Sequence, residues 1–281
     1  MTSLNGSNGM APYLGKLVVV KDMAPEIKLF GVELLNGGNA RFADYKPGQF
    51  AFVSAFGAGE APFGIASSPQ RGEVLEFAVQ RLGSVTTELH EMGEGDTVGV
   101  RGPLGNHFPM DAFKGKDLVV LGGGIGGAPL RPVLQTVLDN RADYGHLTIL
   151  WAARHPSLLI FRDEYESWRS APDTELHLTV DEPDAGWEHD VGLSTTLLEK
   201  VAPSPKDAIA ITCGPPVMIY YADKTFQALG FTPEQSYVTL EARMHCGIGK
   251  CGRCNLGDKL ICMDGPVFSM AEVGNLMESF L

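Results

Sequence analysis

The sequence has 281 residues, of which 44% are hydrophobic and 20% are charged. This composition predicts a folded protein of about two domains rather than a disordered chain. The net charge is −12, with 22 Lys and Arg against 34 Asp and Glu, which argues against a nucleic-acid partner because phosphate binding needs clustered basic side chains. The longest uncharged apolar stretch, 118–130, is too short to span a bilayer, and the chain starts without a basic, apolar leader. We therefore expect a cytoplasmic protein with no membrane span.

Residues 1–10 are rich in Asn, Gly and Ser, and we expect a flexible N-terminus there. The region that follows shows short β-like runs separated by turn residues, with one short helix at 84–92. Several short strands at this spacing predict an antiparallel β-barrel over residues 11–113. The expected strands cover 14–23, 28–35, 48–56, 74–82 and 96–103.

From residue 114 the pattern changes to strands alternating with helices, which predicts an α/β nucleotide-binding domain with a parallel sheet over 114–234. The expected strands cover 117–124, 146–154, 176–183 and 208–216, and the expected helices cover 128–140, 160–170, 194–200 and 218–229. Residues 235–281 hold a cysteine cluster and an expected helix at 270–280, and we assign them to a small third domain. The predicted fold class is therefore multidomain.

Four of the five cysteines lie in one short segment and carry the sharpest chemical signal in the sequence. Their spacing is C-x4-C-x2-C-x7-C, and the first three match the pattern of plant-type [2Fe–2S] proteins. Two glycines in the first loop suit the tight turns that direct amides toward the sulfurs. A structural zinc site is the main alternative, although only one C-x2-C pair is present, and disulfides or free thiols are the third possibility. The predicted metal ligands are Cys246, Cys251, Cys254 and Cys262.

A glycine-rich run follows the first expected strand of the α/β region and opens a helix. It contains G-x-G-x-x-G at Gly122, Gly124 and Gly127, which lets the backbone approach a pyrophosphate at the helix N-terminus. Any tight turn can carry glycines, so the signal rests on its strand–helix context. Arg154 lies near the end of the second strand and is a candidate for holding the 2′-phosphate of NADP, with a solvated surface arginine as the alternative. The candidate nucleotide-binding residues of the run are Gly122, Gly123, Gly124, Ile125 and Gly126.

The last expected strand of the α/β region runs into Cys213-Gly214-Pro215-Pro216. Ligands of open parallel sheets bind at the carboxyl ends of the strands, so Cys213, Gly214 and Pro215 are expected to line a nicotinamide pocket. Cys213 is thus our candidate for a residue at the reacting centre. No base nearby in the sequence would activate its thiol as a nucleophile, and a buried structural cysteine is the alternative.

Two segments of the barrel region suit a flat ring that carries a phosphate. Segment 62–69 combines an aromatic residue, a glycine and small residues, and the helix at residue 84 begins with hydroxyl residues and free amides that can bind phosphate. An ordinary strand and an ordinary helix cap are the alternatives. The loop at 102–108, which begins with GPLGN, is expected to close the barrel. The candidate residues are Phe63, Gly64, Ile65, Ala66, Ser67, Gly83, Ser84, Val85 and Thr86.

Taken in chain order, these segments and the four cysteines resemble the ferredoxin–NADP reductase superfamily, in the branch with a C-terminal [2Fe–2S] domain. That branch includes the gamma subunit of cytoplasmic NiFe hydrogenases (sulfhydrogenases), the B subunit of anaerobic sulfite reductase and the electron-transfer subunit of dihydroorotate dehydrogenase. The segments MHCGIGKCGRC at 244–254 and CMDGPVF at 262–268 are most similar to the hydrogenase and sulfite reductase members. The resemblance implies FAD on the barrel, NAD(H) or NADP(H) on the α/β domain, and the cluster near the C-terminus.

One segment departs from that family. Members commonly carry R-x-Y-S or R-P-x-S at the flavin strand, whereas this chain has Ala61, Pro62, Phe63 and Gly64 there. The arginine that would pair with the flavin phosphate is absent, and Arg81 is the candidate substitute. Losing one charge-assisted contact costs about 1.5–3 kcal/mol, so we expect FAD to be held more loosely than usual.

The chemistry of the three expected electron carriers determines the order in which electrons would pass between them. A nicotinamide transfers two electrons as hydride, a [2Fe–2S] cluster takes one electron at a time, and a flavin can do both. The resemblance therefore implies an oxidoreductase subunit that passes electrons between NAD(P)H, FAD, the cluster and a partner subunit of a hydrogenase-type complex. A dihydroorotate dehydrogenase electron-transfer subunit and an electron-bifurcating module are alternatives within this class. A zinc-stabilised scaffold without enzymatic activity is the alternative from another class.

Overall fold

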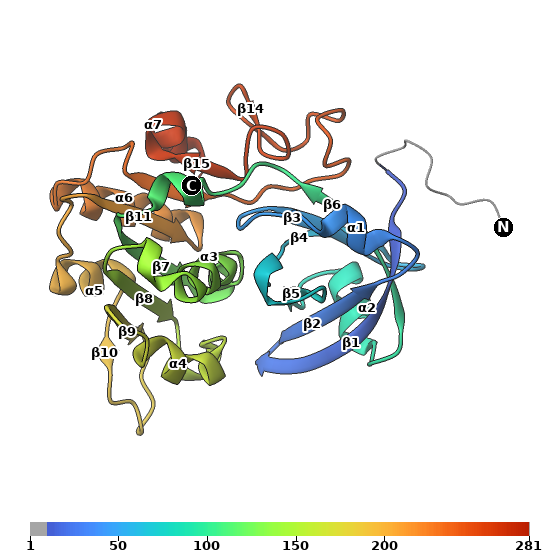
Figure 1. Cartoon of the computed structure of the whole chain (residues 1–281), viewed down its shortest axis with the longest axis horizontal. Coiled ribbons are helices and arrows are strands. Elements are labelled where there is room, and N and C mark those ends of the chain that lie inside the picture. Colours follow the sequence, from blue (N-terminus) through green and yellow to red (C-terminus); the bar gives the residue numbers. More distant parts are fainter. Residues whose placement is uncertain (1–9, 281) are drawn as a thin grey trace.

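The computed structural model describes residues 10–280, and side chains up to residue 277. The expected flexible N-terminus lies, Met10 apart, outside the described residues. An antiparallel sheet comes first, a parallel sheet second and the cysteine-rich segment last, so the expected fold class is confirmed (Figure 1). None of the helices in the described chain combines the length and the apolar character needed to cross a bilayer.

The first sheet has six antiparallel strands in the order β4-β3-β6-β1-β2-β5. Its outer strands approach each other at the Ala66 amide, which donates to the Glu76 carbonyl oxygen at 2.7 Å, so the sheet curls into a barrel. Apolar side chains at alternate positions, among them Phe30, Phe77 and Val98, fill its interior. The strands are β1 (Tyr13–Ala24), β2 (Ile27–Leu34), β3 (Phe50–Ala55), β4 (Gly59–Gly64), β5 (Leu75–Gln80) and β6 (Thr97–Leu104), and the helices are α1 (Gly38–Phe42) and α2 (Ser84–Glu91).

The second sheet has seven strands in the order β10-β9-β8-β7-β11-β12-β15, and only β15 runs antiparallel to its neighbour. Its strands are β7 (Asp117–Gly123), β8 (Leu147–Ala153), β9 (Thr174–Val180), β10 (Asp190–Val191), β11 (Ala208–Cys213), β12 (Ser236–Thr239) and β15 (Val267–Ser269). Most of these strands are buried on both faces, which is why they read as continuous apolar runs.

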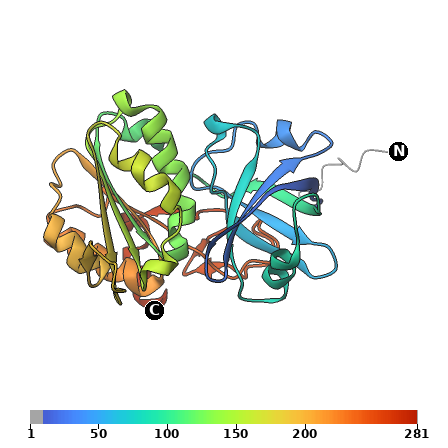
Figure 2. The ribbon, with the colours of Figure 1, turned by 90° about the horizontal axis from the view of Figure 1, so that it is seen from below.

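Helices cover both faces of this parallel sheet. The helices α3 (Gly127–Asp139) and α4 (Tyr165–Arg169) pack on the face turned toward the barrel, and α5 (Ser194–Val201) and α6 (Pro216–Ala228) pack on the other (Figure 2). The stretch expected to be helical over 160–170 is a 3-10 turn, η6 (Arg162–Glu164), followed by the short helix α4.

The cysteine-rich segment 240–266 connects two neighbouring strands of the parallel sheet, β12 and β15, and extends toward the barrel (Figure 1). It contains a small hairpin of β13 (Asn255–Leu256) and β14 (Lys259–Leu260). The expected terminal helix is α7 (Met270–Val273), continued as a 3-10 helix, η7 (Gly274–Phe280). Because β12 and β15 complete the parallel sheet, that sheet crosses the expected boundary at 234/235, and the domain limits stay a prediction.

Candidate functional site

The four clustered cysteines form two pairs. Cys251 contributes to the pKa shift of the Cys246 thiol, and Cys254 contributes to that of Cys262, so the thiols interact as two neighbouring pairs. All four cysteines are free of disulfides. In the described part of the chain, no group of three or more His, Cys, Asp or Glu side chains is placed to hold a metal ion. A [2Fe–2S] cluster needs two thiolates on each of two irons, whereas a structural zinc needs four ligands around one point. Two neighbouring pairs of cysteines supply the donor set that a [2Fe–2S] cluster needs.

Backbone amides point at these sulfurs. Ile248 and Cys251 donate their N–H groups to Cys246 Sγ at 3.5 and 3.4 Å, and Gly249 donates to Cys262 Sγ at 3.3 Å. The Ile248 amide lowers the pKa of the Cys246 thiol to about 6, while burial raises the pKa of Cys262 to about 11. Amides directed at sulfur stabilise the thiolate, which is the form that binds iron.

The inner side of the cysteine loop packs against the barrel. Gly247 has a φ of +68°, and a Cβ there would lie 2.6 Å from Phe52 Cε2 on β3 and 3.0 Å from Leu104 Cδ1 on β6. Glycine is thus required both by the left-handed conformation and by the close approach to Phe52. This contact holds the Cys246 end of the loop against strands β3 and β6 of the barrel.

Arg101 on β6 also joins the barrel to this loop, although it is not among the site residues expected from the sequence. Its side chain is 2% exposed, and its guanidinium lies 4.2 Å from the centre of the Phe52 ring. The Nη1 group donates to the Cys246 carbonyl oxygen at 2.8 Å, and Nη2 pairs with Glu60 Oε1 at 2.6 Å. A buried charge requires such partners. The only signal in the sequence is an arginine at a position of β6 where the neighbours are Val and Gly.

The GPLGN loop is a second attachment between the barrel and the C-terminal segment. Asn106 Nδ2 donates to the carbonyl oxygens of Asp264 and Val267 at 2.8 and 2.7 Å, and its Oδ1 accepts from the Val267 amide at 2.9 Å. The Asn106 amide donates to the Gly265 carbonyl oxygen. The expectation that this loop closes the barrel stays a prediction, and the side-chain hydrogen bonds of Asn106 also hold the chain that leads from the last cysteine into β15.

Of the five expected flavin residues on and after β4, only Phe63 and Gly64 are partly exposed. The amides of Ile65 and Ala66 are used in hydrogen bonds to the carbonyl oxygens of Gln49 and Glu76. Ser67 is also buried, and its Oγ bonds to Tyr45 Oη at 2.9 Å. A ring lying on this strand would therefore meet Phe63 and Gly64 first. A Cβ at Gly64 would lie 3.0 Å from Pro129 Cβ, so the strand ends against α3 of the nucleotide region.

The first turn of α2 is open to solvent. A Cβ at Gly83 would meet nothing within 4 Å, and the amides of this turn lack helical carbonyl partners. The Thr86 hydroxyl is occupied, because it accepts from the amides of Leu82 and Gly83 and donates to the Gly83 carbonyl. The free amides and the Ser84 hydroxyl fit a phosphate better than Thr86 Oγ1 does.

Arg81, our candidate for pairing with the flavin phosphate, is held elsewhere. Its guanidinium makes a two-point ion pair with Glu26, at 2.5 and 2.9 Å, and lies 3.7 Å from Glu91. The role of Arg81 toward a flavin stays a prediction. Its ion pairs with Glu26 and Glu91 would have to break before it could bind a flavin phosphate.

The fold brings the two expected nucleotide-binding segments together. The turn 122–126 and the turn after β11 touch, since a Cβ at Gly126 would lie 2.7 Å from the Cys213 carbonyl oxygen and from Gly214 Cα. Gly124 has a φ of +55°, and nothing lies within 4 Å of the Cβ position. The backbone of Gly124 therefore forms the open side of this turn, and a pyrophosphate can approach it without meeting a side chain.

Cys213 lies at the carboxyl end of β11 and is 9% exposed. Burial, and to a smaller extent the Glu241 carboxylate, raises the pKa of this thiol well above its ordinary range. A protonated thiol does not act as a nucleophile, so any role of Cys213 is limited to lining the pocket. Arg154 follows β8 on the same edge of the sheet, with an exposed side chain that pairs with Glu182 at 3.2 Å.

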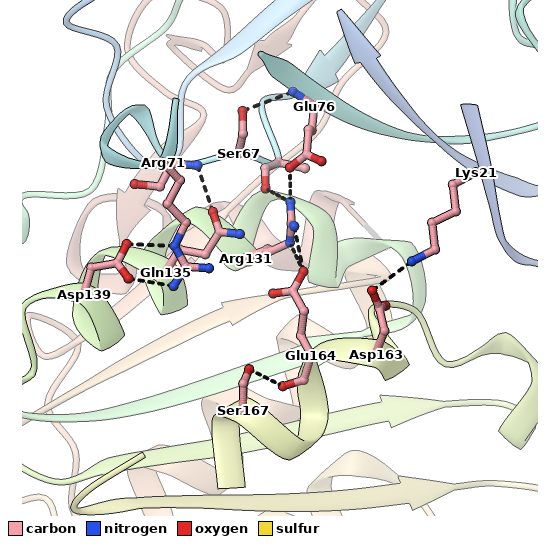
Figure 3. Close-up of polar contacts among 12 residues, drawn as sticks. Lys21, Ser67, Arg71, Glu76, Arg131, Gln135, Asp139, Asp163, Glu164 and Ser167 are labelled. Atoms are coloured by element: carbon pink, nitrogen blue, oxygen red, sulfur yellow. Dashed lines mark hydrogen bonds and ion pairs between the residues drawn. The ribbon is translucent and has the colours of Figure 1, made fainter. Parts of the chain in front are cut away.

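A second buried arginine joins the barrel to the nucleotide region (Figure 3). Arg131 on α3 donates to the Ala66 carbonyl oxygen at 2.8 Å and pairs with Glu76 on β5 and Glu164 on η6, both at 2.6 Å. Around it, Arg71 pairs with Asp139 at 2.7 Å and Lys21 pairs with Asp163 at 2.8 Å. These contacts fix how the end of β4 faces the glycine-rich turn.

Two family models match the chain. The model described as the oxidoreductase NAD-binding domain matches residues 120–224, which include the glycine-rich turn and most of α6. The model described as the iron-sulfur cluster binding domain of dihydroorotate dehydrogenase B matches residues 241–274, which include all four clustered cysteines.

Curated relatives match almost the whole chain. Sulfhydrogenase 1 subunit gamma of Pyrococcus furiosus is 37% identical over 272 residues, which is 95% of this chain and 93% of the relative. A probable dihydroorotate dehydrogenase B (NAD(+)) electron transfer subunit of Methanocaldococcus jannaschii is 32% identical over 261 residues, with coverages of 92% and 89%.

A solved structure of an NADH-dependent reduced ferredoxin–NADP oxidoreductase, studied for flavin-based electron bifurcation, is similar over 98% of this chain and 94% of its own. Its TM-score is 0.75 at 25% identity. The resemblance drawn from the sequence motifs is thus confirmed. The chain belongs to the family of oxidoreductase subunits that includes the sulfhydrogenase gamma subunits and the electron transfer subunits of dihydroorotate dehydrogenase B.

Proposed function

We propose that this chain is an NAD(P)H-linked electron-transfer subunit that carries FAD and a [2Fe–2S] cluster and exchanges electrons with a partner subunit. The observation that carries the proposal is the docking of the cysteine loop on the barrel through Phe52, Leu104 and Arg101. That docking sets the metal-binding loop against the proposed flavin domain, while the nucleotide region meets the same barrel at Arg131. Family membership at 37% identity over nearly the full length supports the same function.

Three sets of residues would hold the three groups. Phe63, Gly64 and the first turn of α2 would bind FAD, the turn 122–126 with Gly214, Pro215 and Arg154 would bind the nicotinamide nucleotide, and the four paired cysteines would bind the cluster. Bound FAD supplies the change from two-electron to one-electron chemistry. The chain itself supplies position: Arg131 orients the nucleotide region on the barrel, and Arg101 and Asn106 hold the cysteine loop. We keep residues 11–113, 114–234 and 235–281 as the proposed extents of the three domains.

The partner is proposed to be the catalytic or electron-carrying subunit of a heteromeric redox complex in the cytoplasm. The relatives named as sulfhydrogenase subunits favour a hydrogenase-type partner. An electron-bifurcating role is a second candidate, because the similar solved structure belongs to a bifurcating enzyme.

Visible spectra and electron paramagnetic resonance (EPR) of the anaerobic holoprotein, before and after NADH or NADPH, test the proposal. We expect flavin and iron–sulfur bands that bleach with one nucleotide better than with the other. A Cys251→Ala variant should retain flavin bleaching and lose both the EPR signal of the reduced cluster and transfer to the partner. Cys213→Ala is the matched control, since it removes a cysteine outside the cluster and should leave the EPR signal of the dithionite-reduced protein unchanged.

A colourless protein with one tetrahedral metal, after reconstitution with FAD, iron and sulfide, would contradict the proposal and favour a zinc-stabilised scaffold. Loss of flavin bleaching in Cys251→Ala, with FAD still bound, would contradict the proposed order of the carriers.

A further inference from the structure

The cysteine loop has an inner and an outer side. On the inner side Gly247 is buried against Phe52, and Arg101 holds the Cys246 carbonyl. Cys254 and Cys262 are each 2% exposed. Cys251 is the one exposed residue of the four. Because electron transfer weakens steeply with distance, an electron leaves such a cluster most easily at the Cys251 side.

The charged residues that flank Cys251 in the sequence are opposite in sign to the net charge of the chain. Arg243, Lys250 and Arg253 are exposed, and no acidic residue lies between Glu241 and Asp258, although the chain carries 34 acidic residues against 22 basic ones. In the described part of the chain, none of the ion pairs involves these three side chains. Arg243, Lys250 and Arg253 are called the basic edge below.

The neighbourhood of the loop also offers an apolar contact. Met263 is 54% exposed, although a Cβ at Gly249 would lie only 2.8 Å from Met263 Cγ. An exposed apolar side chain close to unpaired charges is the composition of a protein-binding patch, with an apolar centre and a polar rim. Both features lie on the segment that carries the exposed cluster ligand.

We propose that the basic edge is the docking surface for an acidic redox protein, which accepts or donates one electron at the Cys251 side of the cluster. This inference rests on the proposed electron-transfer function. The net charge of −12 would by itself favour a basic partner, but charges more than about 8 Å away are largely screened at physiological ionic strength. The local charge that a partner meets at the exit is therefore positive. The step transfers one electron and neither forms nor breaks a bond.

Two small oxidants of opposite charge test the local sign. The dithionite-reduced holoprotein is freed of reductant and mixed with ferricyanide, a trianion, or with hexaammineruthenium(III), a trication. Rapid-freeze EPR then follows the signal of the reduced cluster, so that flavin oxidation is not counted. A triple variant, Arg243→Gln, Lys250→Gln and Arg253→Gln, is compared with a control triple, Lys16→Gln, Arg162→Gln and Lys206→Gln. The control residues are exposed, form no ion pair among the described residues, and lie on β1, on η6 and in the loop before β11.

At low ionic strength, the basic-edge variant should react about tenfold more slowly with ferricyanide and faster with hexaammineruthenium(III). The control triple has the same net charge and should change neither rate appreciably. A shift in cluster potential or a damaged loop would move both rates together, and that result would overturn the proposal.

A protein-sized probe completes the test. Binding of an acidic [2Fe–2S] ferredoxin to the oxidised holoprotein, measured by surface plasmon resonance at low salt, should weaken about tenfold in the basic-edge variant and stay unchanged in the control. Equal binding by both variants would also overturn the proposal. Because the cluster is reduced chemically in the kinetic test, a failure of NAD(P)H to reduce the protein would contradict the proposed function without affecting these results.

Discussion

The barrel is joined to the rest of the chain in two places, and the two joints differ in how far their ion pairs extend to the surface. At the cluster joint, Phe50 and Phe52 share one core with Val238, Ile261 and Phe268. The ion pair at this joint joins Arg101, which is 2% exposed, to Glu60, which is 28% exposed. A core of aromatic side chains with a buried arginine sets the cysteine loop at a fixed position on the barrel.

The nucleotide joint also buries apolar side chains, but its ion pairs extend to the surface. Arg131 is largely buried, whereas the side chains of Arg71 and Asp139 are 40% and 32% exposed, and Lys21 and Asp163 are more exposed still. Exposed ion pairs contribute little to stability, because water and salt screen them. The comparison indicates that packing fixes the position of the cysteine loop on the barrel. The exposed ion pairs at the rim of the nucleotide joint orient the two regions but add little to the free energy of unfolding.

Phe52→Ala should have the largest effect, because it removes a fully buried ring from the cluster joint. We expect the free energy of unfolding to fall by about 3–5 kcal/mol, measured by urea denaturation of the holoprotein. Phe77→Ala is the matched control, since Phe77 is equally buried in the barrel core away from the cysteine loop. Both variants should lose stability, and only Phe52→Ala should also alter the EPR spectrum. Identical spectra would show that the packing of Phe52 does not position the loop.

Arg101→Met should lower the free energy of unfolding by about 2–4 kcal/mol, since it breaks a buried ion pair and leaves the Cys246 carbonyl without its donor. It should also lower the reduction potential of the cluster, because a nearby positive charge favours the reduced, more negative state. Glu60→Gln removes the opposite charge and should raise that potential. An EPR-monitored redox titration of both variants is the measurement, and shifts of the same sign would contradict an electrostatic effect of this ion pair on the cluster potential.

Asn106→Ala should lower the free energy of unfolding by about 1–3 kcal/mol, because three side-chain hydrogen bonds to the segment before β15 are lost. Asn106→Asp keeps the bond from the Val267 amide and loses the two donated bonds. It separates the contribution of the acceptor from that of the donors. We expect trypsin cleavage after Lys259 to accelerate in both variants, and an unchanged cleavage rate would show that the loop does not hold this segment.

A structural feature of this protein can be predicted from the sequence when the residues that form it lie close together along the chain. The barrel strands and the alternating strands and helices follow from local periodicity, and the cysteine spacing is local as well. The strands β12 and β15 have four and three residues, too few to show a period, and they pair only after the intervening loop returns. The cluster region was therefore expected as a separate domain, although its flanking strands complete the nucleotide-binding sheet.

The site residues follow the same rule. Arg101 and Cys246 are 145 positions apart, and Asn106 and Val267 are 161 apart, so no local pattern indicates either contact. On the barrel, the sequence indicated an extended segment for a flavin. It could not indicate that the amides of Ile65 and Ala66 are already used by Gln49 and Glu76. Pairing of backbone groups is settled by strand register, which the sequence of one strand does not contain.

The smallest expected effect lies at the rim of the nucleotide joint and sharpens the comparison most directly. The Arg71–Asp139 pair has two-point geometry, with both bonds at 2.7 Å, yet both side chains meet solvent. A double-mutant cycle of Arg71→Gln and Asp139→Asn should give a coupling energy of about 0.5 kcal/mol, falling further at high salt. The same cycle with Arg131→Gln and Glu76→Gln should give a coupling at least about twice as large, because that pair is shielded from water. Equal couplings in the two cycles would mean that burial does not distinguish the centre of this joint from its rim, and the contrast with the cluster joint would then rest on packing alone.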